Sequence, residues 1–572
     1  MIPLKTSDDE LLMQINATLA QWHASNNVQR LWSRDATLWT GADEASWLGW
    51  LEIVKEQLEQ DEHLRAIADE IRQAGFSHAL LLGMGGSSLC PEVLKTTFGT
   101  IDGFPELFVL DSTDPAQINT FERKVDLAHT LFIISSKSGT TLEPNILKQY
   151  FFERVKQVVG AQRVGQQFLA ITDPGSALHR VAEADGFRHI LFGVPSIGGR
   201  FSALSNFGMA PAAIMGINTQ QLLRRAEMMV RACSPDRPAP ENPGVVLGAI
   251  LGVLANHGRN KVTIIASPAI RSLGAWLEQL LAESTGKAGR GLIPVDGEPI
   301  GQADVYGDDR LFIYVRLEAA PDATQDAAID LLEAAGQPVV RLSMTEPMEI
   351  GQEFFRWEMA TAVAGSIMGI HPFNQPDVEA SKVETRNLTA AYEQAGSLPP
   401  ETPILQEDGI KLFADEANAA ALAQAAGHEQ SLVGYLRAHL RRIGAGDYFA
   451  LLAYIEMNEA HEHELQKMRR LVRDATRAAT CLGFGPRFLH STGQVYKGGP
   501  NTGVFLQITA DDAVDLPVPG QAYTFGVVKA AQARGDFQVL AQRGRRLLRV
   551  HLSADTEAGL AMLREATAAA TR

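Results

Sequence analysis

A loop rich in hydroxyl side chains follows the apolar run TLFIIS (130–135). The stretch SSKSGTTLE (135–143) holds five serine and threonine residues around one lysine and one glycine. A strand that leads through such residues into a helix presents free backbone N–H groups and the positive end of the helix dipole to an anion, and the hydroxyls add donors. A phosphate would fit this site. A helix cap made by Ser138 and Glu143 would explain the same residues without a ligand.

Two other glycine-containing turns could contribute to an anion site. GMGGSSL (83–89) follows an apolar run, and its glycines allow close backbone approach while Ser87 and Ser88 can donate hydrogen bonds. In PSIGGRFSALSNFG (195–208), Arg200 lies between a glycine and a phenylalanine, which suits a fixed guanidinium aimed at an anion or an oxyanion. Each segment alone is equally explained by a tight turn or a structural arginine. Turns that follow strands of one sheet favour a shared anion site.

A carboxylate and a lysine complete the set of reactive side chains. Glu283 ends an apolar helical stripe just before Ser-Thr-Gly, where burial makes a carboxylate a stronger base. The alternative is a solvated glutamate at a helix end. In GIHPFNQPDVEASK (369–382), two prolines form a rigid turn before a helix that places Val378 and Lys382 on one face. Lys382 is alternatively a solvated helix lysine.

The elements that must position these residues alternate between apolar runs and helical stretches. After a helical region (8–75), short apolar runs occur at 78–85, 106–112, 130–136, 167–173 and 189–195. Runs of this length with helix-length segments between them indicate parallel strands joined by helical crossovers. The sequence therefore predicts a doubly wound α/β domain.

A similar series begins near residue 244, and a third mixed region follows residue 400. Apolar runs recur at 260–267, 291–295, 310–317 and 338–344, after a linker with four prolines (234–244). The third region contains DYFALLAYIE, a basic stretch read as one helix (464–480), GVFLQIT and RRLLRVHLS. We predict an N-terminal helical segment (1–75), two doubly wound parallel-sheet domains (76–233 and 244–392) and a small C-terminal α/β region (400–572).

Composition excludes several classes of protein. The net charge of -16 argues against binding to nucleic acid or to an acidic membrane surface, which require positive potential. Three distant cysteines make neither a disulfide framework nor a thiolate metal cluster. No segment has the length of a membrane span, so we expect a soluble cytoplasmic protein.

The motifs GMGGSS, SSKSGTTLE, GGRFS, ESTGK and HPFNQPDVEASK occur in one order along the chain. In this order and spacing they resemble glucose-6-phosphate isomerase, a family built on two sugar-isomerase (SIS) domains. With the tail segment LGFGPRFLHSTGQVYKGGPNTGVF (482–505), the chain most resembles the isomerase half of bacterial bifunctional transaldolase/glucose-6-phosphate isomerase. It has no room for a separate transaldolase barrel. The tail loop has the composition of an anion site and equally that of a structural connection.

The resemblance implies a role for each matching residue. Glu283 would move a proton between C1 and C2, Arg200 would stabilise the cis-enediol(ate), and Lys382 would assist ring opening. Neither metal nor organic cofactor is implied; the partners are a sugar phosphate and, as a homodimer, a second copy of the chain. The residues that would bind the substrate, chiefly its phosphate, are Gly86, Ser87, Ser136, Lys137, Ser138, Thr141 and Gln375.

One catalytic residue of the family is missing from its usual place. The family's ring-opening histidine lies shortly after the catalytic glutamate, yet no histidine occurs between His257 and His371. His371 stands where the family motif usually has asparagine, and we hypothesise that it replaces the missing acid. Alternatively, His371 hydrogen-bonds the turn as asparagine would. His490 is a second candidate, and a dimer partner could also supply the histidine.

Two other functions stay open on the sequence. A broader isomerase would also accept mannose 6-phosphate, with Thr285 as one residue that could read the C2 hydroxyl. A phosphosugar-binding SIS regulator would keep SSKSGTT but would not need Glu283, Arg200 and Lys382 together.

Overall fold

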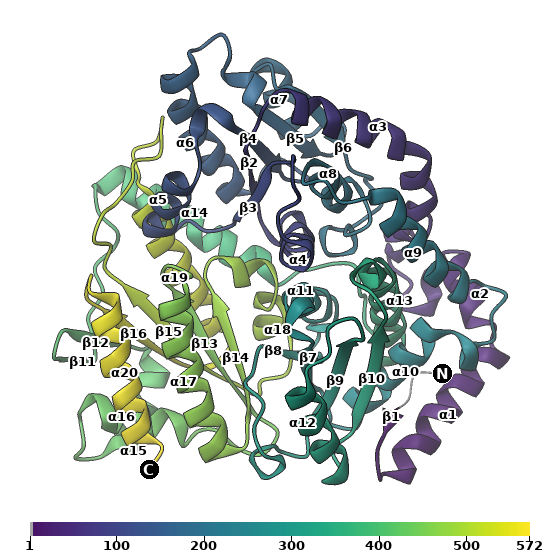
Figure 1. Cartoon of the computed structure of the whole chain (residues 1–572). Helices are drawn as coiled ribbons and strands as arrows, with labels where there is room; N and C mark the ends of the chain where they lie inside the picture. The colour runs from purple at the N-terminus through teal and green to yellow at the C-terminus, as the bar shows by residue number, and fades with distance from the viewer. Residues whose placement is uncertain (1–3) are drawn as a thin grey trace.

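The computed structural model describes residues 4–572 and arranges them as three β-sheets flanked by helices (Figure 1). Two sheets have five strands and the third has six. The alternation of strands and helices along the chain confirms the α/β class predicted from the sequence.

The first sheet is entirely parallel, with the strand order β3-β2-β4-β5-β6. Its strands match the five predicted apolar runs, because β2, β4 and β5 are covered on both faces and need apolar side chains throughout. The strands are β2 (His78–Gly83), β3 (Glu106–Leu110), β4 (Thr130–Ser135), β5 (Phe168–Thr172) and β6 (His189–Phe192). The helices of this part are α4 (Leu89–Phe98), α5 (Pro115–Lys124), α6 (Leu142–Val159), α7 (Ala177–Ala184), α8 (Asn206–Ile214) and α9 (Thr219–Ala232).

The second sheet has the order β1-β10-β9-β7-β8 and is parallel except for β1. The antiparallel strand β1 comes from the N-terminal segment, for which only helices were predicted. The strands are β1 (Leu4–Lys5), β7 (Lys261–Ala266), β8 (Ile293–Asp296), β9 (Arg310–Leu317) and β10 (Val339–Met344). The helices are α10 (Pro243–Asn256), α11 (Leu273–Thr285), α12 (Ala323–Ala334), α13 (Ile350–Met368) and α14 (Val378–Ala395).

The third sheet has the order β11-β12-β16-β15-β13-β14, of which the last four strands are parallel. Its edge strand β14 was not predicted: the helix expected over 464–480 ends at Thr476, and Arg477 takes a left-handed φ of 62°. The strands are β11 (Leu405–Glu407), β12 (Ile410–Phe413), β13 (Tyr448–Tyr454), β14 (Ala479–Phe484), β15 (Gly503–Ala510) and β16 (Arg546–Leu552). The helices are α15 (Glu416–Ala426), α16 (Leu432–Leu440), α17 (Glu459–Thr476), α18 (Gly493–Gly498), α19 (Phe525–Gln542) and α20 (Thr556–Ala570).

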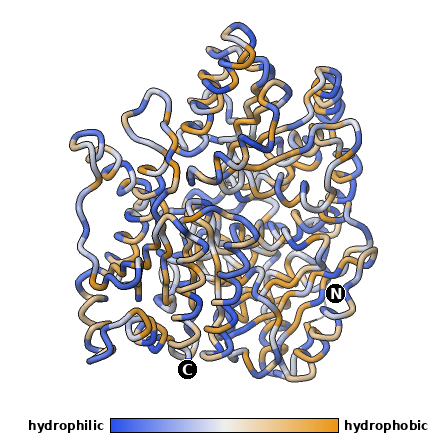
Figure 2. Tube along the Cα trace, turned by 60° about the vertical axis from the view of Figure 1, so that its left-hand side comes forward, coloured by the Kyte–Doolittle hydropathy of each residue, from blue (hydrophilic) through white to orange (hydrophobic). Residues whose placement is uncertain are grey.

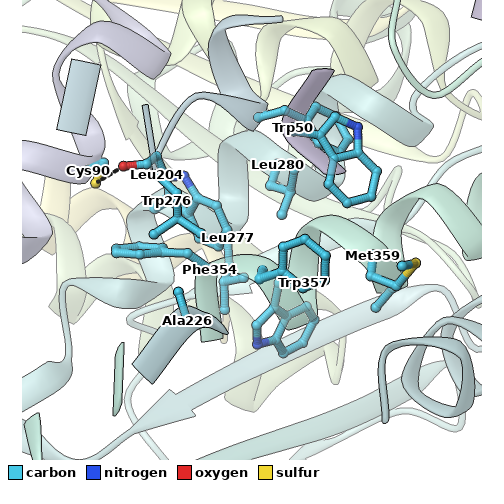
Figure 3. Packing of buried hydrophobic residues seen from close by; sticks show 14 of the residues in the cluster. Trp50, Cys90, Leu204, Ala226, Trp276, Leu277, Leu280, Phe354, Trp357 and Met359 are labelled. Carbon is cyan, nitrogen blue, oxygen red and sulfur yellow. Dashed lines mark hydrogen bonds between the residues drawn. The ribbon is translucent and has the colours of Figure 1, made fainter. Parts of the chain in front are cut away.

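One apolar core joins the N-terminal helices α1 (Asp9–Ala24), α2 (Asn27–Trp32) and α3 (Ile53–Gln73) to the first two sheets. Figure 3 shows Trp276, Leu277 and Leu280 of α11 among aromatic side chains of this core. The ring of Trp276 meets that of Phe354 edge to face, with the centroids 4.9 Å apart. Such packing fixes α11, whose last turn carries Glu283, as a rigid element.

Polar and apolar residues alternate along the helices, as the blue and orange segments of Figure 2 show. This pattern fits helices with one face on a sheet and one in water. Within residues 4–572, no helix is both long enough and apolar enough to cross a bilayer.

Candidate active site

Loops from all three sheets meet at a cavity of about 310 Å³. Val378 lines it beside Lys382, as the predicted helical spacing requires. His371, Ser88 and Thr285 are absent from its lining, but the other residues predicted for the site are present: Gly86, Ser87, Ser136, Lys137, Ser138, Thr141, Arg200, Glu283, Gln375 and Lys382.

The hydroxyl loop (135–141) does not cap α6. Thr141 occupies the N-cap position, but its side chain makes no capping hydrogen bond. The Ser138 hydroxyl lies 2.8 Å from that of Thr140, and Glu143 points to other partners described below. The capping explanation for Ser138 and Glu143 is therefore wrong. Gly139 has a φ of 69°, and a Cβ there would lie 2.2 Å from the backbone nitrogen of Leu178, so only glycine fits.

Lys137 lies at the carboxyl-end edge of the first sheet and contacts the loops that follow β5 and β6. Its ammonium pairs with the Asp173 carboxylate and donates to the carbonyls of Val194, at 3.3 Å, and Pro195, at 3.2 Å. These contacts tie the hydroxyl loop to the segment that leads to Arg200. They also fix a cation beside the loop's hydroxyls, where a phosphate would need one.

The glycine turn after β2 packs directly on the turn that carries Arg200. A Cβ at Gly86 would lie 2.0 Å from the Gly199 carbonyl oxygen. The absent side chain lets the two backbones touch, and Ser87 and Arg200 consequently line the same cavity.

The Arg200 guanidinium is buried and hydrogen-bonded on all sides. It donates to the Ser284 hydroxyl at 2.7 Å, to Gln375 Oε1 at 3.0 Å, and to the carbonyls of Pro372 and Asn374 at 2.8 and 3.0 Å. Burial lowers the pKa of Arg200, and the nearby Glu283 carboxylate opposes this shift. The guanidinium nevertheless stays charged, as it does in proteins generally. Its position is therefore fixed before any substrate arrives.

Glu283 faces the cavity from the last turn of α11 and is only 8% exposed. Its Oε1 lies 3.6 Å from Nη1 of Arg200, and its Oε2 accepts a hydrogen bond from Gln279 Nε2 at 3.1 Å. The solvated helix-end alternative does not apply to this side chain. A buried carboxylate next to a fixed cation is suited to proton transfer at a carbon whose neighbouring oxygen gains charge.

Gln375 lies in the turn before α14, and Lys382 lies in the first turns of that helix. The Lys382 side chain is 46% exposed and its ammonium lies 3.5 Å from Glu379. Because Gln375 Oε1 accepts from Arg200, its amide NH₂ is the end left to donate to a ligand.

His371 is turned away from the cavity and organises the turn before α14. Its Nδ1 accepts from the backbone N–H groups of Phe373 and Asn374, at 3.1 and 3.3 Å, and its Nε2 lies 2.7 Å from Asp43 Oδ1. Its carbonyl accepts from Lys287 at 2.5 Å. These contacts match the turn-forming alternative, so a direct role in ring opening lacks support from this geometry.

Thr285 is likewise occupied elsewhere. Its hydroxyl donates to the Leu281 carbonyl at 2.6 Å and accepts from the Leu292 N–H at 2.9 Å, and the residue does not line the cavity. The hydroxyl closes the end of α11 and is not free to read a substrate hydroxyl.

His490, the second candidate for the ring-opening histidine, meets a glutamate to which the resemblance gives no role. His490 lines the cavity from the loop after β14, and its Nε2 lies 3.0 Å from Oε1 of Glu143, which is buried beneath the hydroxyl loop. These residues are 347 positions apart in the chain, and the local sequence around neither of them predicts their contact.

Parallel sheets whose loops meet at one polar cavity define the chain as an α/β protein with a candidate site for a polar ligand. The family model for phosphoglucose isomerase matches residues 54–294, which include Glu283 but end before Lys382 and His490. Over these residues the chain is similar to this family.

Curated relatives show the same similarity. A glucose-6-phosphate isomerase of Parabacteroides distasonis is 30% identical over 301 residues, which cover 46% of this chain and 66% of the relative. A glucose-6-phosphate isomerase of Rubrobacter xylanophilus is 28% identical over 372 residues, covering 56% of this chain and 85% of the relative. The chain thus spans just under two thirds of the first relative and most of the second.

Solved structures show the same fold. A hypothetical protein from Thermus thermophilus superposes with a TM-score of 0.57 at 26% identity, over 68% of this chain and 99% of that chain. A glucose-6-phosphate isomerase from Chlamydia trachomatis superposes with a TM-score of 0.52 at 21% identity, over 64% of this chain and 78% of its own. Both comparisons leave about a third of this chain unmatched.

Proposed function

We propose that this chain interconverts glucose 6-phosphate and fructose 6-phosphate through an open-chain cis-enediol(ate). The observation that carries the proposal is the convergence of Glu283, Arg200 and Lys382 with the hydroxyl loop on one cavity. A phosphosugar-binding regulator would need the loop but not the three reactive side chains.

The chemistry follows from the positions of these groups. The hydroxyl loop and Lys137 hold the phosphate, which directs the sugar toward Glu283. In the open aldose, the Glu283 carboxylate takes the proton from C2, and the electrons of the C–H bond move to form the enediolate, whose negative charge rests on O1 beside Arg200. Glu283 then delivers the proton to C1 while the O2 hydroxyl proton passes to O1, which leaves the carbonyl at C2.

The decisive test is the Glu283→Gln variant. It keeps the size and hydrogen bonding of the side chain but cannot accept the C2 proton, so turnover should fall by roughly 10²–10⁴-fold. A coupled assay of isomerisation measures the loss, and calorimetry should show fructose 6-phosphate binding retained. Glu62→Gln, at an exposed position on α3, is the control and should keep full turnover. An unchanged rate in the Glu283 variant would refute this assignment of the base.

We also propose that the chain lacks transaldolase activity, because its three sheets are open and leave no (β/α)8 barrel within residues 4–572. Borohydride reduction with a ketose phosphate should leave the chain unlabelled, whereas covalent labelling of a lysine would contradict the proposal.

Family resemblance further supports a cytoplasmic homodimer acting in glycolysis and gluconeogenesis. Light scattering at low micromolar concentration tests the dimer. Acceptance of mannose 6-phosphate is decided by assaying both aldoses, and the occupied hydroxyl of Thr285 gives no support to that residue as the reader of C2.

A further inference from the structure

The loop after β14 carries a histidine from the third sheet into the cavity of the first two. This histidine loop (485–492) leaves the carboxyl end of an edge strand and ends next to α18, which contacts α11 (Figure 1). Of the histidines in residues 4–572, His490 alone lines the cavity.

The backbone of His490 is fixed by the elements that carry the other reactive groups. Its carbonyl oxygen accepts from Gln279 Nε2 at 2.8 Å, and the same amide nitrogen donates to Glu283. A Cβ at Gly85 would lie 2.9 Å from that carbonyl oxygen and 3.2 Å from the His490 Cβ. A glycine at 85, with φ of 55°, therefore makes room for the histidine loop. One amide thus links the proposed base to the histidine loop.

The side chain of His490 is oriented by a buried carboxylate. Glu143 is 4% exposed and accepts at Oε1 from His490 Nε2, at 3.0 Å, and from Gln532 Nε2, at 2.6 Å. Burial alone would raise the pKa of Glu143, but His490, a backbone N–H and the Lys382 charge together outweigh burial, and the pKa is lowered. The carboxylate therefore stays ionised and fixes the proton of His490 on Nε2. Within the described residues, Nδ1 has no hydrogen-bond partner and is the ring nitrogen left for a ligand.

We propose that His490, oriented by Glu143, is the acid and base that opens and closes the sugar ring, so that the C-terminal region of the same chain completes the active site. The proposal rests on the isomerase function and names a histidine for ring opening, because the usual position shortly after Glu283 has none. His490 and Lys382 both line the cavity with Glu283, so the ring-opening groups and the proton-transfer group face one substrate.

The ring-opening step balances with these groups. Protonated Nδ1 of His490 gives its proton to the ring oxygen as the bond between C1 and that oxygen breaks, and the bonding electrons remain on the oxygen. The C1 hydroxyl loses its proton to water and becomes the aldehyde. Ring closure in the ketose reverses these transfers, and His490 regains its proton from the ring-closing hydroxyl. No oxidant, reductant or metal enters the step.

Ring opening and isomerisation can be measured separately, which gives the test. Exchange between the α and β anomers of glucose 6-phosphate needs ring opening but no transfer between C1 and C2, and magnetisation-transfer NMR follows it. We expect the Glu283→Gln variant to accelerate anomer exchange as the parent does without isomerising. His490→Asn should lose both activities by roughly 10²-fold or more, and Glu143→Gln should lose them by a smaller factor.

Controls separate this role from a structural one. His63→Asn, at an exposed position on α3, should behave as the parent, and thermal melting with fructose 6-phosphate binding should show that His490→Asn is folded and occupied. A His490→Asn protein that accelerates anomer exchange at the parental rate overturns the inference. A parent chain that does not isomerise glucose 6-phosphate overturns the proposed function itself, which is a distinguishable result.

Mixing two inactive variants tests whether one chain holds the whole site. Glu283→Gln and His490→Asn chains, unfolded together and refolded, should give no active site in any pairing, because both residues belong to the same cavity. Recovery of activity to about a quarter to a half of the parental value would show that the histidine crosses a subunit interface, and would overturn the proposal.

Discussion

The hydroxyl loop and the α18 helix (Gly493–Gly498) differ in how they use their polar groups. Both follow a parallel strand, and both contain glycine together with polar and basic residues. In the hydroxyl loop, Thr141 makes no capping bond and the buried Ser135 hydroxyl has no partner in the described chain. In α18, Gln494 bonds the Gly286 carbonyl and Asp377, and Lys497 pairs with Asp536. The unpaired hydroxyls of Ser135 and Thr141 are available to a ligand, whereas the paired groups of α18 hold neighbouring elements in place.

The α18 helix supports the elements that carry Glu283 and Lys382. A Cβ at Gly286, just after α11, would lie 2.3 Å from the Val495 Cα, and a Cβ at Gly498 would lie 2.2 Å from Asp377 Oδ2. Asp377 precedes α14, which carries Lys382. Contacts this close fix the positions of Glu283 and Lys382 relative to each other, although the two residues lie on different helices.

The largest predicted effect comes from removing the buried ammonium of Lys497 on α18. Lys497 and Asp536 are 1% and 0% exposed and lie 2.6 Å apart. The Lys497→Met variant leaves Asp536 charged and buried, so the free energy of unfolding should fall by about 3–5 kcal/mol, with isomerase activity falling in parallel. Urea unfolding measures the first quantity and a coupled assay the second.

Its controls distinguish a buried pair from an exposed one. Lys467→Met breaks a pair with Glu464 at the surface and should cost at most about 1 kcal/mol. The double variant Lys497→Met, Asp536→Asn removes both buried charges and should recover most of the lost stability. If Lys497→Met alone unfolds like the parent, α18 is not the support described here.

A smaller effect is expected from the hydroxyl loop, and it should appear in substrate affinity instead of stability. Because Thr141 makes no capping bond, Thr141→Val should leave the urea midpoint unchanged. A hydrogen bond to a charged phosphate contributes about 1.5–3 kcal/mol, so KM should rise roughly tenfold or more. Ser431 caps α16, because its hydroxyl accepts a hydrogen bond from the Gly434 N–H at 3.1 Å. The Ser431→Ala variant should therefore show the reverse result: the free energy of unfolding should fall by about 1 kcal/mol while KM is unchanged.

The parallel strands of the first two sheets and the hydroxyl loop could be located from the sequence because their signals are local. Buried parallel strands require uninterrupted apolar runs, and these gave β2 to β10 within a few residues. Strand β14 was not predicted because RAATCLGF continues a helical pattern, and the left-handed turn at Arg477 has no glycine to mark it. The pairing of Glu143 with His490 depends on how three sheets pack, which no local pattern encodes.

The smallest predicted effect separates the two histidines that were candidates for ring opening. His371 accepts backbone N–H groups through Nδ1, and an asparagine carbonyl oxygen can accept the same bonds. The His371→Asn variant should therefore isomerise closed-ring glucose 6-phosphate within about threefold of the parent, with the modest loss set by the missing bond to Asp43. A loss as large as that expected for His490→Asn would transfer the ring-opening role back to His371. Because both variants replace histidine with asparagine, the difference between their isomerisation rates reports which imidazole faces the substrate.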